Sequence, residues 1–423
     1  MSIGTRDLSP ARICIISPRH LAANPRLVKE ANTLAEAGYS VEVICGRYSR
    51  WGVSVDAKLI NPYWRAQYVS FGPSEAHATL YMRQTILRKL AKGVASAGFL
   101  SRTISETAYD PATPDLTKTV MKTEADLYIA HYVAALPAAA RAAKKYKVPY
   151  AFDAEDFHLG DLPDGPENVF EKNLISSIEK SYIRDCAYVT AASPLIAEAY
   201  REVYGIKAPI VLLNSFPLRQ APSDPTVNCT KSTPSLYWFS QTIGPDRGLE
   251  CAVQAVGIAK SKPHLYLRGA MASGYETELM KYAAEADAKH RVHILPLEEP
   301  DKMELLASSY DIGLVLETGH SKSRQFCLTN KLFSFLLAGV PPIMSDTAAH
   351  RAFAIEAGLS ELIFPIGDPT ALSNIIDCLL LLPGRLETTK AKIWRLGRER
   401  YNWEGEQGKL LAAVRSVIGV VNA

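Results

Sequence analysis

The sequence lacks the features that define several classes of protein. Its seven cysteines among 423 residues form no Cys-x-x-Cys pair and no Cys/His ligand spacing, so neither a disulfide framework nor a zinc site is expected. No apolar stretch approaches the ~20 residues that cross a bilayer, and the first residues, MSIGTRDLSPAR, are polar rather than a secretory signal. The net charge of +3 is too small to indicate nucleic acid as a partner. We therefore expect a protein of the cytoplasm, free or on the inner face of the membrane.

The residues that are present indicate a two-domain α/β protein. Apolar residues make up 48% of the chain and charged residues 22%, which is typical of globular proteins, and the length predicts two domains. Short apolar runs, such as Ile13–Ile16 and Val41–Cys45, alternate with segments of helical period, which predicts parallel sheets covered on both faces. We expect two Rossmann-like doubly wound domains at 1–216 and 235–400, a Pro-rich linker at 217–234, and a helix at 401–423 that crosses back to the first domain.

Two segments of the second domain carry a cation at the start of a predicted helix. In SQTIGPDRGLE (240–250), a strand ends, Gly244 begins a turn, and Arg247 precedes a helix. In CLTNKLFSFLLAGVPPIMSD (327–346), Thr329 or Asn330 caps a helix whose first turn holds Lys331. Helix N-termini attract anions, and a guanidinium fits phosphate oxygens. Either cation alone is compatible with a solvated side chain at a turn, but together they predict a diphosphate site in the cleft between the domains.

Other chemistries have no matching pattern. No G-x-G-x-x-G follows the first strand, where SPRHLAANPR stands instead, so an NAD-linked oxidoreductase is not favoured. Near the two cations there is no D-x-D and no His/carboxylate cluster with ligand spacing, so we expect no metal and no bound cofactor.

The segment from Thr329 to Asp346 resembles the "N-K-hydrophobic-aromatic … A-G-x-P" signature of family 4 retaining glycosyltransferases, and SQTIGPDRGLE resembles their phosphate-arginine loop. The resemblance continues in IISPRHLAANPRLVKEANTLAEAGYSVEVIC, in DLYIAHYVAALPAAARAAKKYKVPYAFDAEDF, in SYIRDCAYVTAASPLIAEAYREVYG and in YNWEGEQGKLL, so it covers nearly the whole chain in order. It implies the GT-B fold and the transfer of a sugar from a nucleoside-diphosphate sugar to a hydroxyl of a glycan or lipid-linked acceptor, in polysaccharide or glycoconjugate biosynthesis.

The resemblance also implies roles for individual residues. Catalytic roles fall on His131, beside the transferred sugar, and on Arg247 and Lys331, which neutralise the leaving nucleotide. The donor-binding set is Gly244, Arg247, Leu295, Glu317, Thr329, Asn330, Lys331, Leu332 and Ser334. The acceptor-side set is Asn24, Arg26, Glu155 and Asp156.

The chain departs from the family at the sugar end of this site. Most members carry two glutamates with seven residues between them, and those positions fall on Phe326 and Ser334 here. Ser334 can bond a ribose hydroxyl, whereas Phe326 cannot bind a sugar through a polar group, and Glu317 is a substitute. Two other interpretations therefore stay open: a nucleotide-sugar epimerase, and a catalytically weakened GT-B protein that binds a nucleotide sugar.

A basic segment, TLYMRQTILRKLAKGVASAGFL at 79–100, has two interpretations. Arg83, Arg88, Lys89 and Lys92 alternate with apolar residues, a pattern typical of helices that lie on an anionic membrane surface. The alternative is a helix packed on the sheet with a solvated basic face.

Overall fold

The structure, a computed structural model, describes residues 10–73, 76–223 and 233–419, and the chain divides into two compact units. Unit 1 comprises Met1–Leu212 and Gln407–Ala423, and unit 2 comprises Leu213–Glu406. The division after Leu212 lies close to the expected boundary at 216. Half of the expected linker, residues 224–232 with Cys229, falls outside the described residues.

Unit 1 is built on a parallel sheet, seven-stranded among the described residues, in the order β3-β2-β1-β4-β5-β6-β7. Its central strands are buried along almost their whole length because helices cover both faces. The strands are β1 (Arg12–Ser17), β2 (Ser40–Arg47), β3 (Trp64–Ser70), β4 (Leu127–His131), β5 (Tyr150–Ala154), β6 (Val189–Ala191) and β7 (Ile210–Val211).

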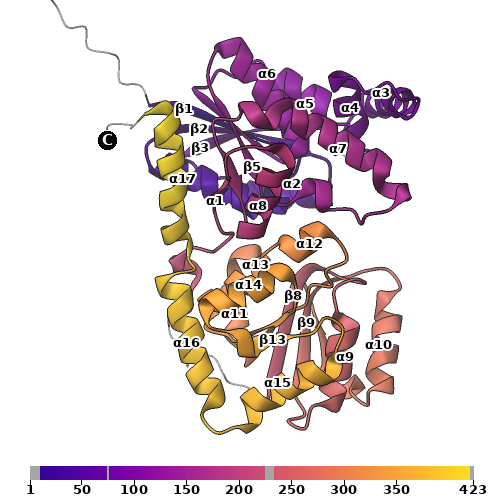
Figure 1. Ribbon diagram of the computed structural model, residues 1–423, viewed down its shortest axis with the longest axis vertical. Helices are drawn as coiled ribbons and strands as arrows, with labels where there is room; N and C mark the ends of the chain where they lie inside the picture. The colour runs from indigo at the N-terminus through magenta and orange to yellow at the C-terminus, as the bar shows by residue number, and fades with distance from the viewer. Residues whose placement is uncertain (1–9, 74–75, 224–232, 420–423) are drawn as a thin grey trace, which may run out of the picture. The chain divides into compact units, whose positions relative to one another are not determined.

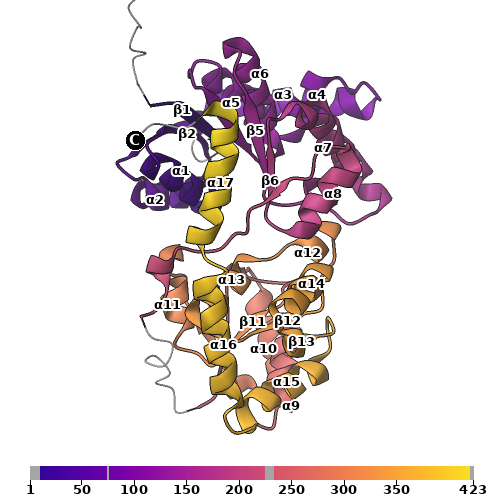
Figure 2. The ribbon, with the colours of Figure 1, turned by 60° about the vertical axis from the view of Figure 1, so that its left-hand side comes forward.

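The helices of unit 1 lie on the two faces of this sheet, with α1 on one face and α5 and α6 on the other (Figures 1 and 2). Helix α1 begins after Asn24, whose side chain accepts a hydrogen bond from the Leu27 N–H, and Pro25 occupies its first turn. The helices are α1 (Pro25–Glu36), α2 (Arg50–Leu59), α3 (Ala78–Ser96), α4 (Arg102–Tyr109), α5 (Thr113–Val120), α6 (Leu136–Tyr146), α7 (Val169–Tyr182), α8 (Pro194–Tyr204) and most of α17 (Trp403–Ile418).

Unit 2 repeats the plan with a parallel sheet of six strands within its described part, in the order β10-β9-β8-β11-β12-β13. In both sheets the strand order reverses beside the first strand of the unit, which is where ligands bind in doubly wound folds. The strands are β8 (Ser235–Ile243), β9 (His264–Met271), β10 (Val292–Leu295), β11 (Ile312–Val315), β12 (Pro342–Ser345) and β13 (Ile363–Phe364).

Two helical layers also cover the sheet of unit 2, with α9, α10 and α15 on one face and α11, α13 and α16 on the other (Figure 1). Helix α13 is apolar and buried from Leu332 onward, and it ends at Gly339 in the left-handed conformation. The helices are α9 (Leu249–Ile258), α10 (Tyr275–Glu285), α11 (Met303–Ala307), α12 (Lys322–Phe326), α13 (Asn330–Ala338), α14 (Ala348–Ala357), α15 (Pro369–Leu381) and α16 (Arg385–Glu399).

The chain enters and leaves unit 2 at neighbouring points. The Leu213 N–H donates to the Glu406 carboxylate at 2.8 Å, and the Trp403 N–H donates to the Phe216 carbonyl at 2.9 Å. These bonds join the first and the last residues of the unit.

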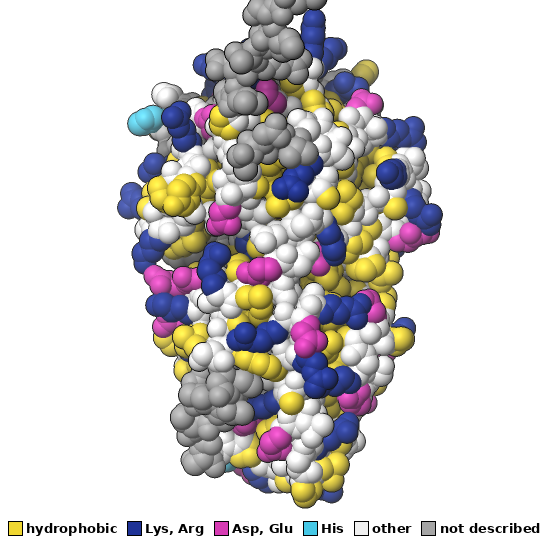
Figure 3. All heavy atoms as spheres, turned by 90° about the vertical axis from the view of Figure 1, so that its left-hand side faces the viewer, with side chains coloured by type: hydrophobic (Ala, Val, Ile, Leu, Met, Phe, Trp, Pro, Cys, Tyr) yellow, Lys and Arg dark blue, Asp and Glu magenta, His cyan; other side chains and the backbone are white. Residues whose placement is uncertain are grey.

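The surface mixes charges of both signs. Cationic and acidic side chains are interspersed on the face shown in Figure 3, in keeping with the small net charge. Among the described residues, no helix has the length and apolar character needed to cross a membrane.

The contact between α13 and α16 gives a test of the packing. A Cβ atom at Gly397 of α16 would lie 2.3 Å from the Leu336 carbonyl oxygen, so Gly397→Ala must push the two helices apart. We expect a loss of about 1–3 kcal/mol in the free energy of unfolding, measured by denaturant titration. Gly408→Ala in α17 is the matched control, because nothing lies within 4 Å of its Cβ position. The control should be neutral or stabilising, and equal effects of the two variants would contradict this packing.

Candidate functional site

The cations predicted from the sequence lie at the carboxyl end of the unit 2 sheet. Arg247 stands in the loop between β8 and α9, just before Gly248, which has a φ of 68°. A Cβ at Gly248 would lie 3.1 Å from the Leu316 Cβ, so this glycine lets the Arg247 loop approach the residue that follows β11. The Thr318 hydroxyl bonds the Asp246 carbonyl oxygen at 3.5 Å across the same contact.

Lys331 lies in the first turn of α13 and is largely buried. Its Nζ is 5.6 Å from the centre of the Trp238 ring and 3.6 Å from Glu317 Oε1. Burial lowers the pKa of Lys331, Glu317 partly restores it, and the nearby charge of Arg247 lowers it further. Thr329 caps the helix through its backbone, and its buried Oγ1 has no hydrogen-bond partner in the described part of the chain. This helix start therefore combines a poorly hydrated cation with a hydroxyl available to a ligand.

Glu317 is the acidic member of the group, and Arg324 is a cation that the sequence did not single out. Glu317 Oε2 lies 3.7 Å from Arg324 Nη1. Burial would raise the pKa of Glu317, but Lys331 and Arg324 outweigh it and lower that pKa below its usual range. Arg247 acts on both Glu317 and Lys331 electrostatically. The arrangement is thus three cations around one ionised carboxylate.

Other predicted donor residues occupy different surroundings. Gly244 is buried after β8, Leu295 ends β10 and is half-buried, and Leu332 is fully buried in α13. Ser334 differs from the expectation of a ribose contact: it is fully buried, and its hydroxyl donates to Glu304 Oε1 at 2.6 Å. Because α11 packs against α13, that hydroxyl is committed to the core.

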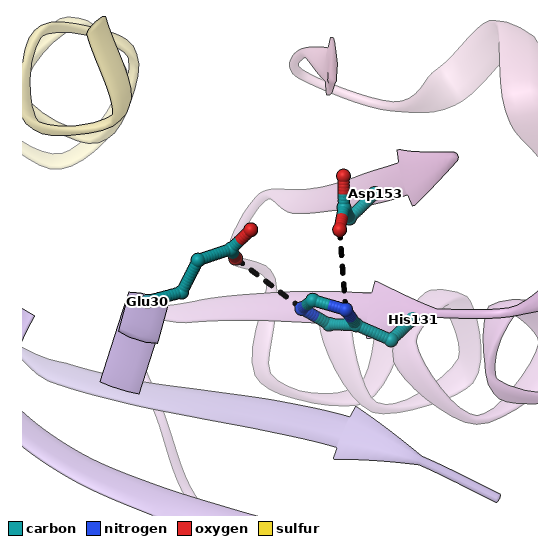
Figure 4. Close-up of side chains that lie close together, drawn as sticks. All are labelled: Glu30, His131 and Asp153. Carbon is teal, nitrogen blue, oxygen red and sulfur yellow. Dashed lines mark ion pairs between the residues drawn. The ribbon is translucent and has the colours of Figure 1, made fainter. Parts of the chain in front are cut away.

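Two of the acceptor-side residues, Asn24 and Arg26, lie in a buried charge network with Glu30, His131 and Asp153, and Figure 4 shows the last three. Arg26 was expected on the first loop, but it lies in the first turn of α1 with no exposed surface. Its guanidinium donates to both carboxylate oxygens of Asp153, at 2.6 and 2.8 Å, and to the Leu212 carbonyl at 2.7 Å. Asn24 Nδ2 lies 3.4 Å from His131 Nδ1.

His131 stands between two carboxylates in this network. Its Nε2 is 3.2 Å from Glu30 Oε2 and its Nδ1 is 3.2 Å from Asp153 Oδ2. Burial would lower the pKa of His131, but Glu30 and Asp153 outweigh it and raise that pKa above its usual value, which favours the imidazolium form. Both nitrogens face protein carboxylates, which ties α1 to β4 and β5. Contact of His131 with a transferred sugar stays a prediction.

The geometry of Glu30, His131 and Asp153 raises the question of a metal ion. One ligand atom from each lies within 4.8 Å of the others. The Arg26 guanidinium, however, already holds both oxygens of Asp153 and lies 3.5 Å from Glu30 Oε1. With His131 protonated, two cations balance two carboxylates. A further cation would meet fixed positive charge, so these residues do not fit a metal.

Glu155 and Asp156 follow β5 at the carboxyl end of the unit 1 sheet. Burial, together with the neighbouring charge of Asp156, raises the pKa of Glu155 to about 7. A carboxyl group that retains its proton near neutrality is able to donate a hydrogen bond as well as accept one.

Comparison with known proteins identifies the first unit. Residues 22–214 match the family described as "Glycosyl transferase 4-like domain". This segment, which makes up most of unit 1, is therefore a member of that family, as the sequence resemblance implied. No curated protein matches the sequence.

Solved structures confirm the GT-B fold over nearly the whole chain. HepE from Anabaena, in complex with UDP-glucose, has a TM-score of 0.70 at 15% identity and covers 96% of this chain and 100% of its own. Sucrose-phosphate synthase from Thermosynechococcus elongatus has a TM-score of 0.72 at 15% identity. The match covers 96% of this chain and 98% of the synthase. A glycosyltransferase from Rickettsia africae has a TM-score of 0.63 at 12% identity. The match covers 97% of this chain and 99% of that protein.

The raised pKa of Glu155 predicts a stability that depends on pH. The folded protein keeps a proton on this carboxyl that the unfolded chain releases, so the stability falls as the pH rises from about 4.5 to about 7. Glu155→Gln removes the loss and should raise the free energy of unfolding by about 1–2 kcal/mol at pH 8, and by less at pH 5. Glu36→Gln, at an exposed site on α1, is the control. A gain for Glu155→Gln that is the same at both pH values would refute this assignment.

Proposed function

We propose that this protein is a glycosyltransferase that moves a sugar from a nucleoside-diphosphate sugar to a hydroxyl of a glycan or lipid-linked acceptor, with retention at the anomeric carbon. The observation that carries the proposal is the convergence of Arg247 and Lys331 at the carboxyl end of one parallel sheet, beside the start of α13. The glycosyl transferase 4-like domain and the GT-B fold support it. Polysaccharide or glycoconjugate biosynthesis is the proposed setting.

In this proposal, unit 2 binds the donor through its diphosphate. Arg247 and Lys331 neutralise the negative charge that grows on the leaving nucleotide as the glycosidic bond breaks. The N–H groups of Asn330 and Lys331, in the first turn of α13, add donors to the same phosphates. The Leu332 N–H already donates to the Thr329 carbonyl at 3.0 Å. Lys331 is desolvated before the ligand arrives, so its charge acts in a medium of low polarity. We propose that these groups suffice without a metal ion.

The identity of the donor follows by analogy only. HepE has been solved with UDP and with UDP-glucose, and a uridine diphosphate sugar is accordingly the first donor to test here. Unit 1 is proposed to bind the acceptor, with Glu155 and Asp156 as the polar groups after β5.

Removal of either cation tests the diphosphate site. Arg247→Ala and Lys331→Ala should each weaken the binding of nucleoside diphosphate by about 1–3 kcal/mol, the range for charge-assisted hydrogen bonds. Calorimetric titration with UDP, GDP and ADP measures this loss. Arg385→Ala removes an exposed arginine of the same unit and should leave the affinity unchanged. If both site variants bind nucleoside diphosphate as tightly as the wild type, the assignment of Arg247 and Lys331 to the diphosphate site is wrong.

Product analysis separates transfer from the alternatives. A transferase releases one nucleoside diphosphate per sugar transferred, whereas an epimerase releases none in steady turnover. Incubation with a panel of nucleotide sugars, followed by detection of free nucleoside diphosphate and by the anomeric configuration of the product, distinguishes them.

We also propose that α3 contacts the membrane surface. Helix α3 buries only Gln84 and Ala95 and packs mainly on α4, not on the sheet. Met82, Ile86, Leu90 and Val94 form an exposed apolar stripe four residues apart, continued by the exposed Phe99 and Leu100. No acidic residue occurs from Ala76 to Ser105, while this stretch carries five cations. An exposed apolar stripe flanked by cations suits an anionic bilayer.

Charged substitutions in the stripe test this contact. Leu90→Asp combined with Phe99→Asp places two carboxylates at positions that are 62% and 69% exposed. Binding to vesicles that contain phosphatidylglycerol should fall by about tenfold or more, since each buried large side chain contributes about 1.5–3 kcal/mol. Leu305→Asp, at an exposed position of unit 2, is the control. If the wild-type protein binds these vesicles no better than phosphatidylcholine vesicles, α3 is not a membrane surface.

A further inference from the structure

The donor end of unit 2 contains an anion of its own. The Glu317 carboxylate lies 3.6 Å from Lys331 Nζ through one oxygen and 3.7 Å from Arg324 Nη1 through the other. Only 8% of the Glu317 side chain is exposed. Among the described residues, these two are the cations that form ion pairs with it. A carboxylate bridging two cations is the arrangement that a phosphate group also adopts.

The backbone holds Glu317 in this position. Its N–H donates to Ser345 Oγ at 2.8 Å, and its carbonyl accepts from the same hydroxyl at 2.7 Å. The Ser345 carbonyl is bonded to His350 Nδ1 at 2.8 Å. Burial lowers the pKa of His350, so the ring is neutral and Nδ1–H is the donor in this bond. Glu317 is thereby held to β12 and, through Ser345, to the first turn of α14.

Helix α12, which carries Arg324, is held in place as well. The Gln325 side chain donates to the Gly319 carbonyl at 3.1 Å and accepts from the Ala348 N–H at 3.1 Å. Ser321 caps α12 by accepting from the Arg324 N–H. Arg324 therefore starts from a defined backbone position, while its own side chain remains 41% exposed and able to turn toward a ligand.

This arrangement has an electrostatic consequence. Arg247, Lys331 and Arg324 would together attract a diphosphate strongly, and the ionised Glu317 opposes that attraction. A ligand phosphate must share Lys331 and Arg324 with the carboxylate, or take them from it. The carboxylate also stabilises the buried Lys331 when no phosphate is present.

We propose that Glu317 is a built-in counter-ion of the donor site, which competes with the diphosphate for Lys331 and Arg324 and so promotes release of the leaving nucleotide. Arg324 is then a third cation of the diphosphate site. This inference rests on the proposed function, because it assigns regulation to the same site. It replaces the expectation that Glu317 is a ligand of the sugar.

The isosteric variant Glu317→Gln removes the charge and keeps the shape. Its affinity for UDP, or for whichever of UDP, GDP and ADP binds the wild-type protein, should rise by about tenfold. The affinity should also depend more steeply on salt, because the site has gained net positive charge. In turnover, inhibition by the released nucleotide should strengthen. Glu361→Gln makes the same change of net charge at an exposed site of unit 2 and should alter none of these quantities.

Arg324→Gln provides a second line of test at an accessible position, where a loss of folding is not expected. It should weaken binding of the nucleotide in the wild-type background. The gain in affinity of Glu317→Gln comes largely from Arg324, which that change releases to the phosphate. The double variant lacks Arg324 and should therefore lose most of this gain. If Arg324→Gln changes the affinity in neither background, Arg324 is not part of the site.

The outcomes separate this inference from the proposed function. If the wild-type protein binds no nucleoside diphosphate, or if Arg247→Ala binds it equally well, the proposed donor site itself is wrong. If Arg247→Ala weakens binding but Glu317→Gln binds no more tightly than the wild type, the donor site stands and the counter-ion role of Glu317 is overturned. Thermal unfolding of each variant establishes that it is folded.

Discussion

The constraint on which both units depend is the parallel arrangement of their strands. Parallel strands end at the same edge of a sheet, so the segments that follow β8 and β11 meet although a long stretch of sequence separates them. Arg247, Glu317 and Lys331 come together in this way. In unit 1, the ends of β4 and β5 bring His131 and Asp153 to one place. The strand order of each sheet therefore brings these residues close together, whatever contacts their side chains then form.

The balance of buried charge differs between the carboxyl ends of the two sheets. In unit 1, Arg26 and His131 are balanced by Glu30 and Asp153 with almost no exposed surface, so the network is closed to further charge. A balanced buried network of this kind fixes positions and is damaged by the loss of any one member. In unit 2, three cations face one carboxylate, and a net positive charge is left. The closed set is suited to holding α1 on the sheet, and the open set is suited to an anionic ligand.

The sequence predicted the features that local spacing determines. The alternation of strands and helices follows from short-range patterns, and so do the positions of Arg247 just before one helix and of Lys331 just within another. The contacts that give these residues their surroundings join distant segments. Asp153 meets Arg26 across 127 positions, and Glu304 meets Ser334 across 30. No local pattern indicates such pairings. For the same reason, Arg26 and Ser334 were expected in open positions, whereas folding buried both.

The bonds that join Leu213 to Glu406 and Phe216 to Trp403 give unit 2 a particular topological status. It is an insertion whose two ends are held together, placed inside a chain whose first and last residues both belong to unit 1. An inserted domain with adjacent termini can be exchanged as a block by gene rearrangement, because its two points of attachment to the other domain lie close together. Unit 2 is thus a self-contained block, and its exchange would require no change in unit 1.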